Sequence, residues 1–178
     1  APESADFVSG ALILVDKPQG WTSFDVVNKI RGMIRHKFSV KKIKVGHSGT
    51  LDPMATGLLL ICTGSWTKEL HHLTGLDTKH ISKITLSIET DSYDDEGKIV
   101  STKEVPALTE DEIKKHLETF IGDLEQYPPA FSAIKKDGVP LYEMARAGKE
   151  VKTEARKVKV FAIELINYTP PVVEIMVH

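Results

Sequence analysis

The chain has 178 residues, of which 41% are hydrophobic and 27% are charged, and its formal net charge is −2. This length suits one globular domain with a buried core. The near-neutral charge argues against a wholly basic nucleic-acid clamp but leaves room for a local basic patch. The single cysteine, Cys62, cannot form an internal disulfide, so we expect a reducing, cytoplasmic compartment. No apolar run approaches the roughly 18 residues of a membrane span, and we expect no membrane partner.

The two ends of the chain carry no targeting pattern. Residues 1–10, APESADFVSG, lack a basic region followed by an apolar one, and we expect them to form a disordered leader. The chain starts without methionine and stops within the β-patterned run PPVVEIMVH. We therefore expect it to be part of a longer protein.

The first elements read as a strand followed by a helix. The run ALILVDKPQG at 11–20 predicts a buried strand that ends in a turn. The stretch TSFDVVNKIRGMI predicts a helix with Thr22 or Ser23 as its N-cap and Asp25 in its first turn. The residues expected on its buried face are Val26, Val27, Ile30, Met33 and Ile34.

A basic segment and a glycine-rich segment follow. Residues 31–44 carry six Lys or Arg and no acid, and they lead directly into GHSGTLDPMATG at 46–57. After this segment, GLLLICTG predicts a short buried strand, and TKELHHLTGL predicts a helix closed by Gly75.

The second half of the chain alternates short strands with two helices. ISKITLSIE at 81–89 predicts one half-buried strand, and DDEGKIV a turn with a return strand. Thr109 and Glu112 form a capping box before a helix that ends near Gly122. The residues expected on its buried stripe are Ile113, Leu117, Phe120 and Ile121.

Hairpins are expected in the last fifty residues. The segment AFSAIKKDGVPLYEMARAG predicts a hairpin around Asp137 and Gly138 and then a short helix closed by Gly148. VKVFAIELINYT and VVEIMVH predict two strands around Pro170 and Pro171. Strands that neighbour one another, with helices inserted at intervals, predict an α+β domain on a mixed, largely antiparallel sheet with flanking helices.

The sequence does not support three common kinds of functional site. The Gly-Lys pairs at 97–98 and 148–149 are not followed by Ser or Thr, which excludes a phosphate-binding loop of the Gly-x4-Gly-Lys-Ser/Thr type. GHSGT does not match the Gly-x-Ser-x-Gly pattern of a hydrolase. His71 and His72 are adjacent in a helix and point in different directions, so we expect an exposed helix surface and no metal site.

Asp52 has two interpretations from the residues alone. Asp before Pro53 is a common turn starter. Alternatively, a backbone bent by glycines at 46, 49 and 57 lets a lone carboxylate approach a sugar or base and act as a nucleophile without a metal or cofactor. The basic segment is likewise either a solvated helix end or a phosphate-tracking surface. The aromatic residues Phe24, Phe38 and Trp66 are expected in the core rather than on a stacking platform.

Four motifs in order resemble one known family. GHSGTLDPMATG closely resembles the catalytic loop of the bacterial-type tRNA pseudouridine-55 synthases, which isomerise a uridine in the T-loop. The resemblance extends to LILVDKPQGWTSFDVV near the start, TDSYDDEG at 90–97 and PPAFSAIKKDGVPLYEMARAG at 128–148. It implies the pseudouridine synthase fold, with residues 11–178 as the N-terminal part of the catalytic domain.

The resemblance also implies roles for individual residues. Asp52 matches the aspartate that attacks the ribose or the base, and His47 matches a histidine that helps hold the T-loop open around the flipped uridine. Lys17 and Pro18 match a pair that supports the site from below. The expected contacts to T-arm RNA are Arg31, Arg35, Lys41, Lys42, Lys44, Lys135, Tyr142 and Arg146. We expect a monomer that acts on tRNA with no cofactor.

The chain departs from the family pattern at two places. Ten residues before Thr90, where relatives carry a tyrosine that packs against the target base, this chain has His80. The arginine that pairs with the aspartate in relatives is expected just after His178, so this fragment is expected to be poorly active. Two alternatives stay open: a tRNA-binding module without chemistry, and a guide-RNA-dependent pseudouridine synthase.

Overall fold

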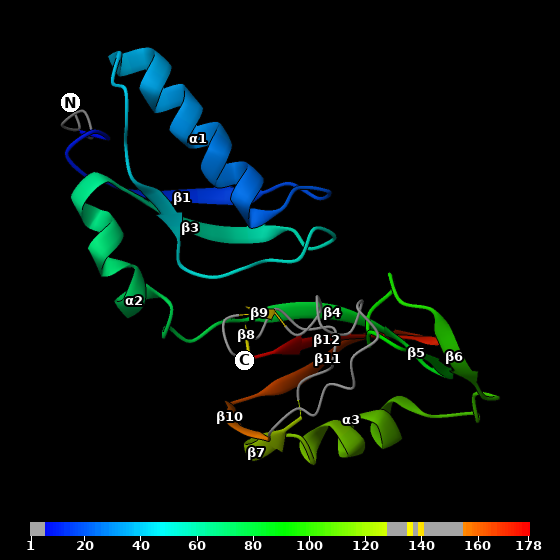
Figure 1. The fold of residues 1–178 in the computed structure, drawn as a ribbon. Helices are drawn as coiled ribbons and strands as arrows, with labels where there is room; N and C mark the ends of the chain where they lie inside the picture. Colours follow the sequence, from blue (N-terminus) through cyan, green and yellow to red (C-terminus); the bar gives the residue numbers. More distant parts are fainter. Residues whose placement is uncertain (1–5, 128–134, 137–138, 141–154) are drawn as a thin grey trace. The chain divides into compact units, whose positions relative to one another are not determined.

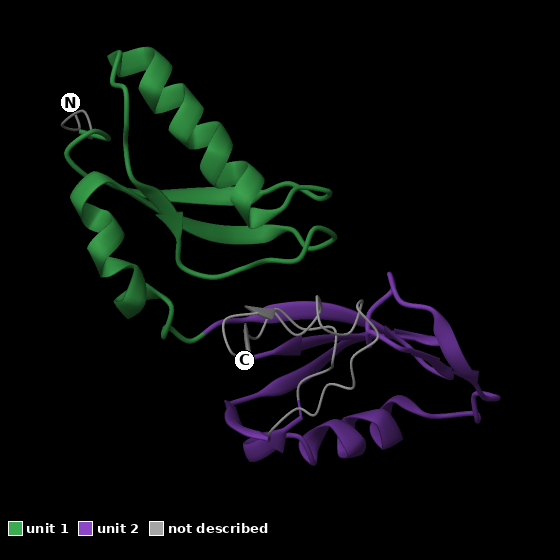
Figure 2. Ribbon diagram, viewed as in Figure 1, with its two compact units in different colours: residues 1–77 green, residues 78–178 purple. Residues whose placement is uncertain are grey.

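The computed structural model describes residues 6–127, 135–136, 139–140 and 155–178. The chain forms two compact units, residues 1–77 and residues 78–178 (Figure 2), and each contains its own hydrophobic core. No helix within the described ranges has both the length and the apolar character that crossing a membrane requires.

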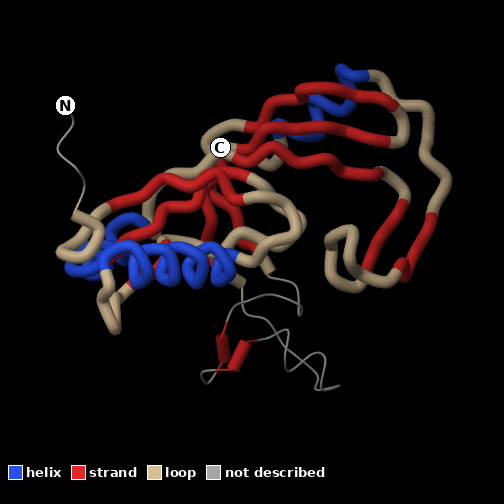
Figure 3. Tube along the Cα trace, turned by 90° about the horizontal axis from the view of Figure 1, so that it is seen from above, coloured by secondary structure: helices blue, strands red, loops and turns tan. Residues whose placement is uncertain are grey.

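The first unit is a three-stranded antiparallel sheet with a long helix on one face. Its strands are β1 (Leu12–Lys17), β3 (Gly57–Thr63) and β2 (Val45–His47), in the spatial order β1-β3-β2. Helix α1 (Ser23–Phe38) runs alongside these strands (Figures 1 and 3). Val26 and Val27 of α1 form a core with Val45, Leu59 and Ile61 of the sheet. A 3-10 turn (Gly64–Glu69) continues into the short α2 (Leu70–Leu73).

Helix α1 begins where the sequence predicted it. Thr22 is the N-cap: its hydroxyl accepts a hydrogen bond from the Asp25 amide at 3.0 Å, and the Asp25 carboxylate accepts one from the Thr22 amide at 2.9 Å. The predicted buried face is confirmed at Val26, Val27 and Ile34. It is wrong at Met33, which is 60% exposed, because six helical positions turn this side chain about 120° away from Val27.

Strand β1 is covered on one face only, whereas the apolar run predicted a fully buried strand. Lys17 is fully buried and Ile13 and Val15 are half-buried, but Leu12 is 39% and Leu14 is 64% exposed. Because side chains alternate along a strand, the face turned from α1 carries these leucines. Strand β3 repeats this arrangement: Leu59 and Ile61 are buried and Leu58 is exposed.

Residues 6–10 form a hydrogen-bonded turn. The Asp6 carboxylate accepts bonds from the amides of Val8 and Ser9, both at 3.0 Å, and the Ser9 carbonyl accepts bonds from the amide and hydroxyl of Ser65 at 2.9 and 2.8 Å. These bonds connect residues 6–10 to the 3-10 turn that follows β3, and the leader expected over 1–10 stays a prediction.

The second unit contains a three-stranded sheet and several hairpins. Its main sheet has the order β11-β12-β4, made of Ile163–Thr169, Val172–Val177 and His80–Thr85. Helix α3 (Glu110–Glu118) packs against β11, and its Ile113 forms a core with Val173 and Ile175 of β12. The remaining pairs are β5 (Ile88–Thr90) with β6 (Ile99–Thr102), β7 (Gly122–Gln126) with β10 (Arg156–Val160), and β8 (Lys135–Lys136) with β9 (Val139–Pro140).

The α+β class is confirmed, and every strand pair among the described residues is antiparallel. The capping box of Thr109 and Glu112 is confirmed, as is the hairpin expected around 137–138. The helix expected to close at Gly148 lies outside the described residues.

Three predictions in this unit are wrong in detail. The single strand expected at 81–89 is interrupted by a turn, because Ser87 takes a positive φ of 70° and redirects the chain from β4 into β5. The strand expected over VKVFAIELINYT is also two strands, β10 and β11. Helix α3 ends at Glu118, so Phe120 and Ile121 follow it and are exposed instead of continuing its buried stripe.

Candidate functional site

Asp52 lies in the loop between β2 and β3, at the edge of the first unit. Its side chain is exposed, and its carbonyl accepts a hydrogen bond from the Ala55 amide at 3.1 Å, which makes the turn that the sequence predicted. The ion pairs found among the described residues both involve Lys114, so none of them engages Asp52. The carboxylate therefore faces solvent on a short, turned segment.

Ser23 holds the residue just before Asp52. Its side chain is buried, with 2% exposure, and its hydroxyl accepts a hydrogen bond from the Leu51 amide at 2.9 Å and donates one to the Leu51 carbonyl at 3.2 Å. Because Ser23 is the first residue of α1, this pair of bonds fastens the Asp52 loop to the start of the helix. Sequence reasoning considered Ser23 only as an N-cap, since a contact across 28 positions leaves no local signal.

Lys17 holds the residue just after Asp52. It is fully buried at the end of β1, and its ammonium donates hydrogen bonds to the carbonyls of Trp21 at 2.6 Å, Pro18 at 3.1 Å and Pro53 at 3.4 Å. The Gly20 amide donates a second bond to the Pro53 carbonyl at 2.7 Å. The backbone is therefore anchored by hydrogen bonds on both sides of Asp52.

His47 ends β2 on the other side of the same loop. Its Nδ1 lies 2.7 Å from the Gly49 carbonyl oxygen, and because a carbonyl can only accept, this nitrogen carries the proton. The loop closes at Gly57, whose φ of +129° is a conformation that other residues rarely adopt. Gly46 has a different role from the expected bend: it lies in β2, and a β-carbon there would come within 2.7 Å of the Leu70 side chain.

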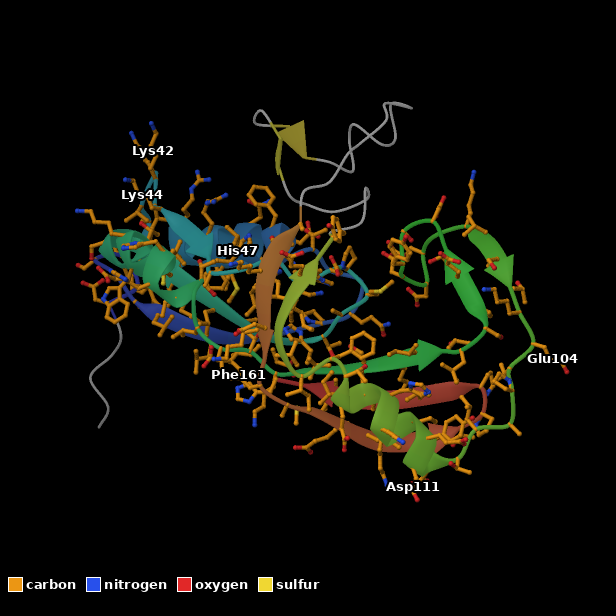
Figure 4. The ribbon with its side chains drawn as sticks, turned by 90° about the horizontal axis from the view of Figure 1, so that it is seen from below. Lys42, Lys44, His47, Glu104, Asp111 and Phe161 are labelled. Carbon is orange, nitrogen blue, oxygen red and sulfur yellow. The ribbon has the colours of Figure 1, made fainter. Side chains whose placement is uncertain are left out.

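The basic segment forms a groove beside β2. The groove has a volume of about 760 Å³ and contains all five cations predicted from the segment: Arg31, Arg35, Lys41, Lys42 and Lys44. Lys42 and Lys44 extend away from the ribbon on the approach to the strand that carries His47 (Figure 4). Ile43, Val45, Gly46, Thr67 and Leu70 complete the lining. A concentration of positive charge with few acids suits the phosphates of a nucleic acid.

Three aromatic side chains expected in the core are instead on the surface. Phe24 is 59% exposed, Phe38 39% and Trp66 44%. Phe24 and Phe38 occupy the ends of α1, and Trp66 lies in the 3-10 turn after β3. Helix periodicity explains the exposure of Phe24, because its position is turned by about 100° around the helix axis from the buried stripe.

The remaining predicted residues belong to the second unit. His80 opens β4; it is exposed, and its Nε2 lies 3.0 Å from the Thr78 hydroxyl oxygen. Lys135 opens β8, while Tyr142 and Arg146 lie outside the described residues. The structure thus brings together Lys17, His47, Asp52 and the basic groove within one unit.

The cysteine thiol and the side chains able to bind a metal ion do not form a second candidate site among the described residues. Cys62 is fully buried in β3. This burial is the main reason why the pKa of its thiol is raised, and the nearby Glu69 carboxylate raises the pKa further. A thiol with a raised pKa is a poor nucleophile at neutral pH. Within the ranges that the structure describes, no three His, Cys, Asp or Glu side chains gather closely enough to hold a metal ion.

Comparison with known proteins gives consistent results. Residues 35–178 match the family described as "TruB family pseudouridylate synthase (N terminal domain)". The chain is 42% identical to the tRNA pseudouridine synthase B of Flavobacterium johnsoniae over 97% of its own length and 76% of the relative's. It is 43% identical to the protein of that name from Phocaeicola vulgatus, over 97% and 73%.

Solved structures share the fold. The chain resembles one in the crystal structure of a Cbf5-Nop10-Gar1 complex with a TM-score of 0.61 and 25% identity. The match covers 96% of this chain and 39% of the other. A second match, from the structure of an H/ACA ribonucleoprotein bound to a substrate RNA, has a TM-score of 0.60 and 23% identity.

Proposed function

Since the chain belongs to the TruB family of pseudouridylate synthases, we propose that it converts the T-loop uridine at position 55 of tRNA to pseudouridine, with Asp52 as the nucleophile. The tRNA substrate follows from the names of the relatives that are 42% and 43% identical. The position in the T-loop and the role of Asp52 rest on the motifs and on the site described above.

The observation that carries this proposal is the double anchoring of the Asp52 loop. Ser23 binds both backbone groups of Leu51, and Lys17 and Gly20 bind the carbonyl of Pro53, while the carboxylate between them stays exposed. A residue that served only as a turn would not need a buried cation and a buried hydroxyl to fix it. A nucleophile gains from such fixation because less motion is lost on reaching the transition state.

The reaction is an isomerisation and needs no redox partner. The bond between N1 of uracil and C1′ of ribose breaks, the base rotates, and a bond forms between C5 and C1′. The C5 proton leaves and N1 gains a proton, so atoms balance between substrate and product. Asp52 forms a temporary bond to the ribose or the base, which keeps the fragments together during rotation.

The other residues of the unit bind and open the RNA. A uridine inside a folded loop is unreachable unless it flips out, at a cost of a few kcal/mol of lost stacking. His47, on the same loop as Asp52, would occupy the space that the uridine vacates. The basic groove that precedes it along the chain offers five cations to T-arm phosphates.

The test is tritium release from tRNA labelled at C5 of uridine. Asp52→Asn keeps the size of the side chain and removes its nucleophilic oxygen, so we expect release to fall to background. Asp16→Asn is the matched control: Asp16 is an exposed carboxylate of β1 in the same unit and should release tritium like the parent. Turnover by Asp52→Asn at the parental rate would contradict the assignment.

Two further measurements separate the alternatives. Turnover of an isolated T-stem-loop by the protein alone would exclude dependence on a guide RNA. Tight binding of tRNA without any pseudouridine would support a binding module without chemistry. That alternative is motivated by Asp52, which pairs with no cation among the residues that the structure describes.

A further inference from the structure

One face of α1 carries an unusual stripe of residues. Phe24, Asn28, Arg31 and Arg35 are separated by four, three and four positions, so they lie above one another on the helix surface. The buried residues Val26, Val27 and Ile34 occupy a different face. Phe24, Asn28 and Arg35 of the stripe are exposed, and Arg31 is half-buried.

Phe24 and Arg31 form a cation–π pair in this stripe. The Arg31 guanidinium lies 5.9 Å from the centroid of the Phe24 ring. Arg31 is itself fixed, because it donates hydrogen bonds to the Asn28 side chain at 2.7 Å and to the Val45 carbonyl at 3.2 Å. The Phe24 side chain remains 59% exposed, and it is not part of the core beneath α1. Packing within the unit thus does not explain a large aromatic residue here.

The stripe connects the two parts of the candidate site. At one end, Arg31 and Arg35 line the basic groove. At the other end, Phe24 directly follows Ser23, whose hydroxyl holds Leu51 next to Asp52. A strand whose phosphates occupy the groove and whose reacting nucleotide lies at Asp52 would pass this stripe.

We propose that Phe24, supported by Arg31, is a stacking site for an unpaired nucleobase of the substrate RNA, next to the flipped uridine. This inference rests on the proposed RNA substrate and adds a binding site to it. Unpaired RNA bases stack on aromatic rings and on guanidinium planes, and both are present here. The neighbouring cations favour this occupant over an apolar protein partner, because a base brings a phosphate with it.

The experiment measures tRNA affinity at several salt concentrations, with Asp52→Asn in every variant so that binding is observed without turnover. Stacking contributes to affinity but releases no counterions. Phe24→Ala should therefore weaken binding about tenfold at every salt concentration and leave the salt slope unchanged. Phe24→Tyr, which keeps a ring, should restore the affinity, whereas Phe24→Leu should not.

Met33→Ala is the matched control. Met33 is 60% exposed on the same helix, and nine positions place it about 180° around the axis from Phe24. Removal of the Met33 side chain should leave the affinity for tRNA unchanged. Equal affinity of Phe24→Ala and the parent, or full affinity of Phe24→Leu, would overturn the stacking site.

The outcomes also distinguish this inference from the proposed function. Binding that depends on Phe24, together with no conversion of uridine by the chain with Asp52 intact, would contradict the catalysis and leave the stacking site standing. Absence of any tRNA binding by the parent would overturn both.

Discussion

At the scale of single residues, Ser23 and Lys17 show how a small unit fixes a reactive loop. Both are polar and buried, and both bind backbone groups of the residues that flank Asp52. A buried polar group is costly unless its hydrogen bonds are made, so these two side chains are stable only while the loop keeps its place. The coupling works in both directions, because the loop also loses its partners if either side chain is removed.

Ser23→Ala is expected to lower turnover more than substrate binding. The change leaves the amide and carbonyl of Leu51 without their partner, which should destabilise the fold by about 1–3 kcal/mol. The loosened loop should lower kcat about 10- to 100-fold while KM changes little, because a displacement near 1 Å is enough for such a loss. Steady-state kinetics on tRNA and urea unfolding give the two quantities.

Two control variants test this interpretation. Ser23→Cys retains a weak donor of similar size and should fall between the parent and Ser23→Ala. Ser65→Ala removes another serine hydroxyl of the same unit, one bonded to the Ser9 carbonyl away from the loop, and should keep the parental kcat. A parental kcat in Ser23→Ala would show that the bonds to Leu51 do not position Asp52.

At the scale of elements, local signals located the helices and most strands, and long-range packing decided the rest. The capping box at Thr109 and the N-cap at Thr22 follow from residues within one turn, so the sequence predicted them, although it did not predict that Asp25 completes a second capping box with Thr22. The exposure of Leu14 depends on which face of the sheet α1 covers, and the break at Ser87 depends on the pairing of β5 with β6. Neither contact is visible in a window of a few residues.

The candidate site divides in the same way. Asp52, His47 and the five groove cations lie within residues 31–52, but their roles were predicted from the resemblance, which rests on four motifs spread along the chain. The role of Ser23 in holding the Asp52 loop was not predicted because its partner Leu51 is distant in sequence. The exposure of Phe24 was not predicted because large aromatic side chains are usually buried.

The cap of α1 should make stability depend on acidity. Hydrogen bonds to the Asp25 carboxylate from the Thr22 hydroxyl and then the Thr22 amide lower the pKa of this group. The contribution of the Asp25 carboxylate to the free energy of unfolding is therefore complete above the unfolded pKa of about 3.9, and it is lost as the pH falls through the lower pKa of the folded state. Urea midpoints measured between about pH 2 and 6 should fall less steeply in Asp25→Asn than in the parent. An identical slope in both would exclude a part for this carboxylate.

At the scale of the whole molecule, net charge conceals the property that matters for binding. The chain as a whole is slightly acidic, with a formal charge of −2. Five of its 23 Lys and Arg residues nevertheless line the groove beside β2 without an acidic residue among them, while exposed acids such as Glu104 and Asp111 belong to the second unit (Figure 4). Phosphates respond to the local field within about 10 Å at moderate salt, so the sum over the chain does not predict the affinity for RNA.

Removal of one groove cation should therefore change how tRNA binding responds to salt. Each phosphate neutralised by the protein adds about 0.7 to 0.9 to the slope of log K against log salt. Lys42→Ala should lower the slope by about this amount and weaken binding most at low salt. Lys114→Ala removes the same charge from an ammonium that already lies 3.6 Å from Glu110 and 4.0 Å from Asp111, so its slope should match the parent. Equal slopes for the two variants would show that tRNA phosphates do not occupy the groove.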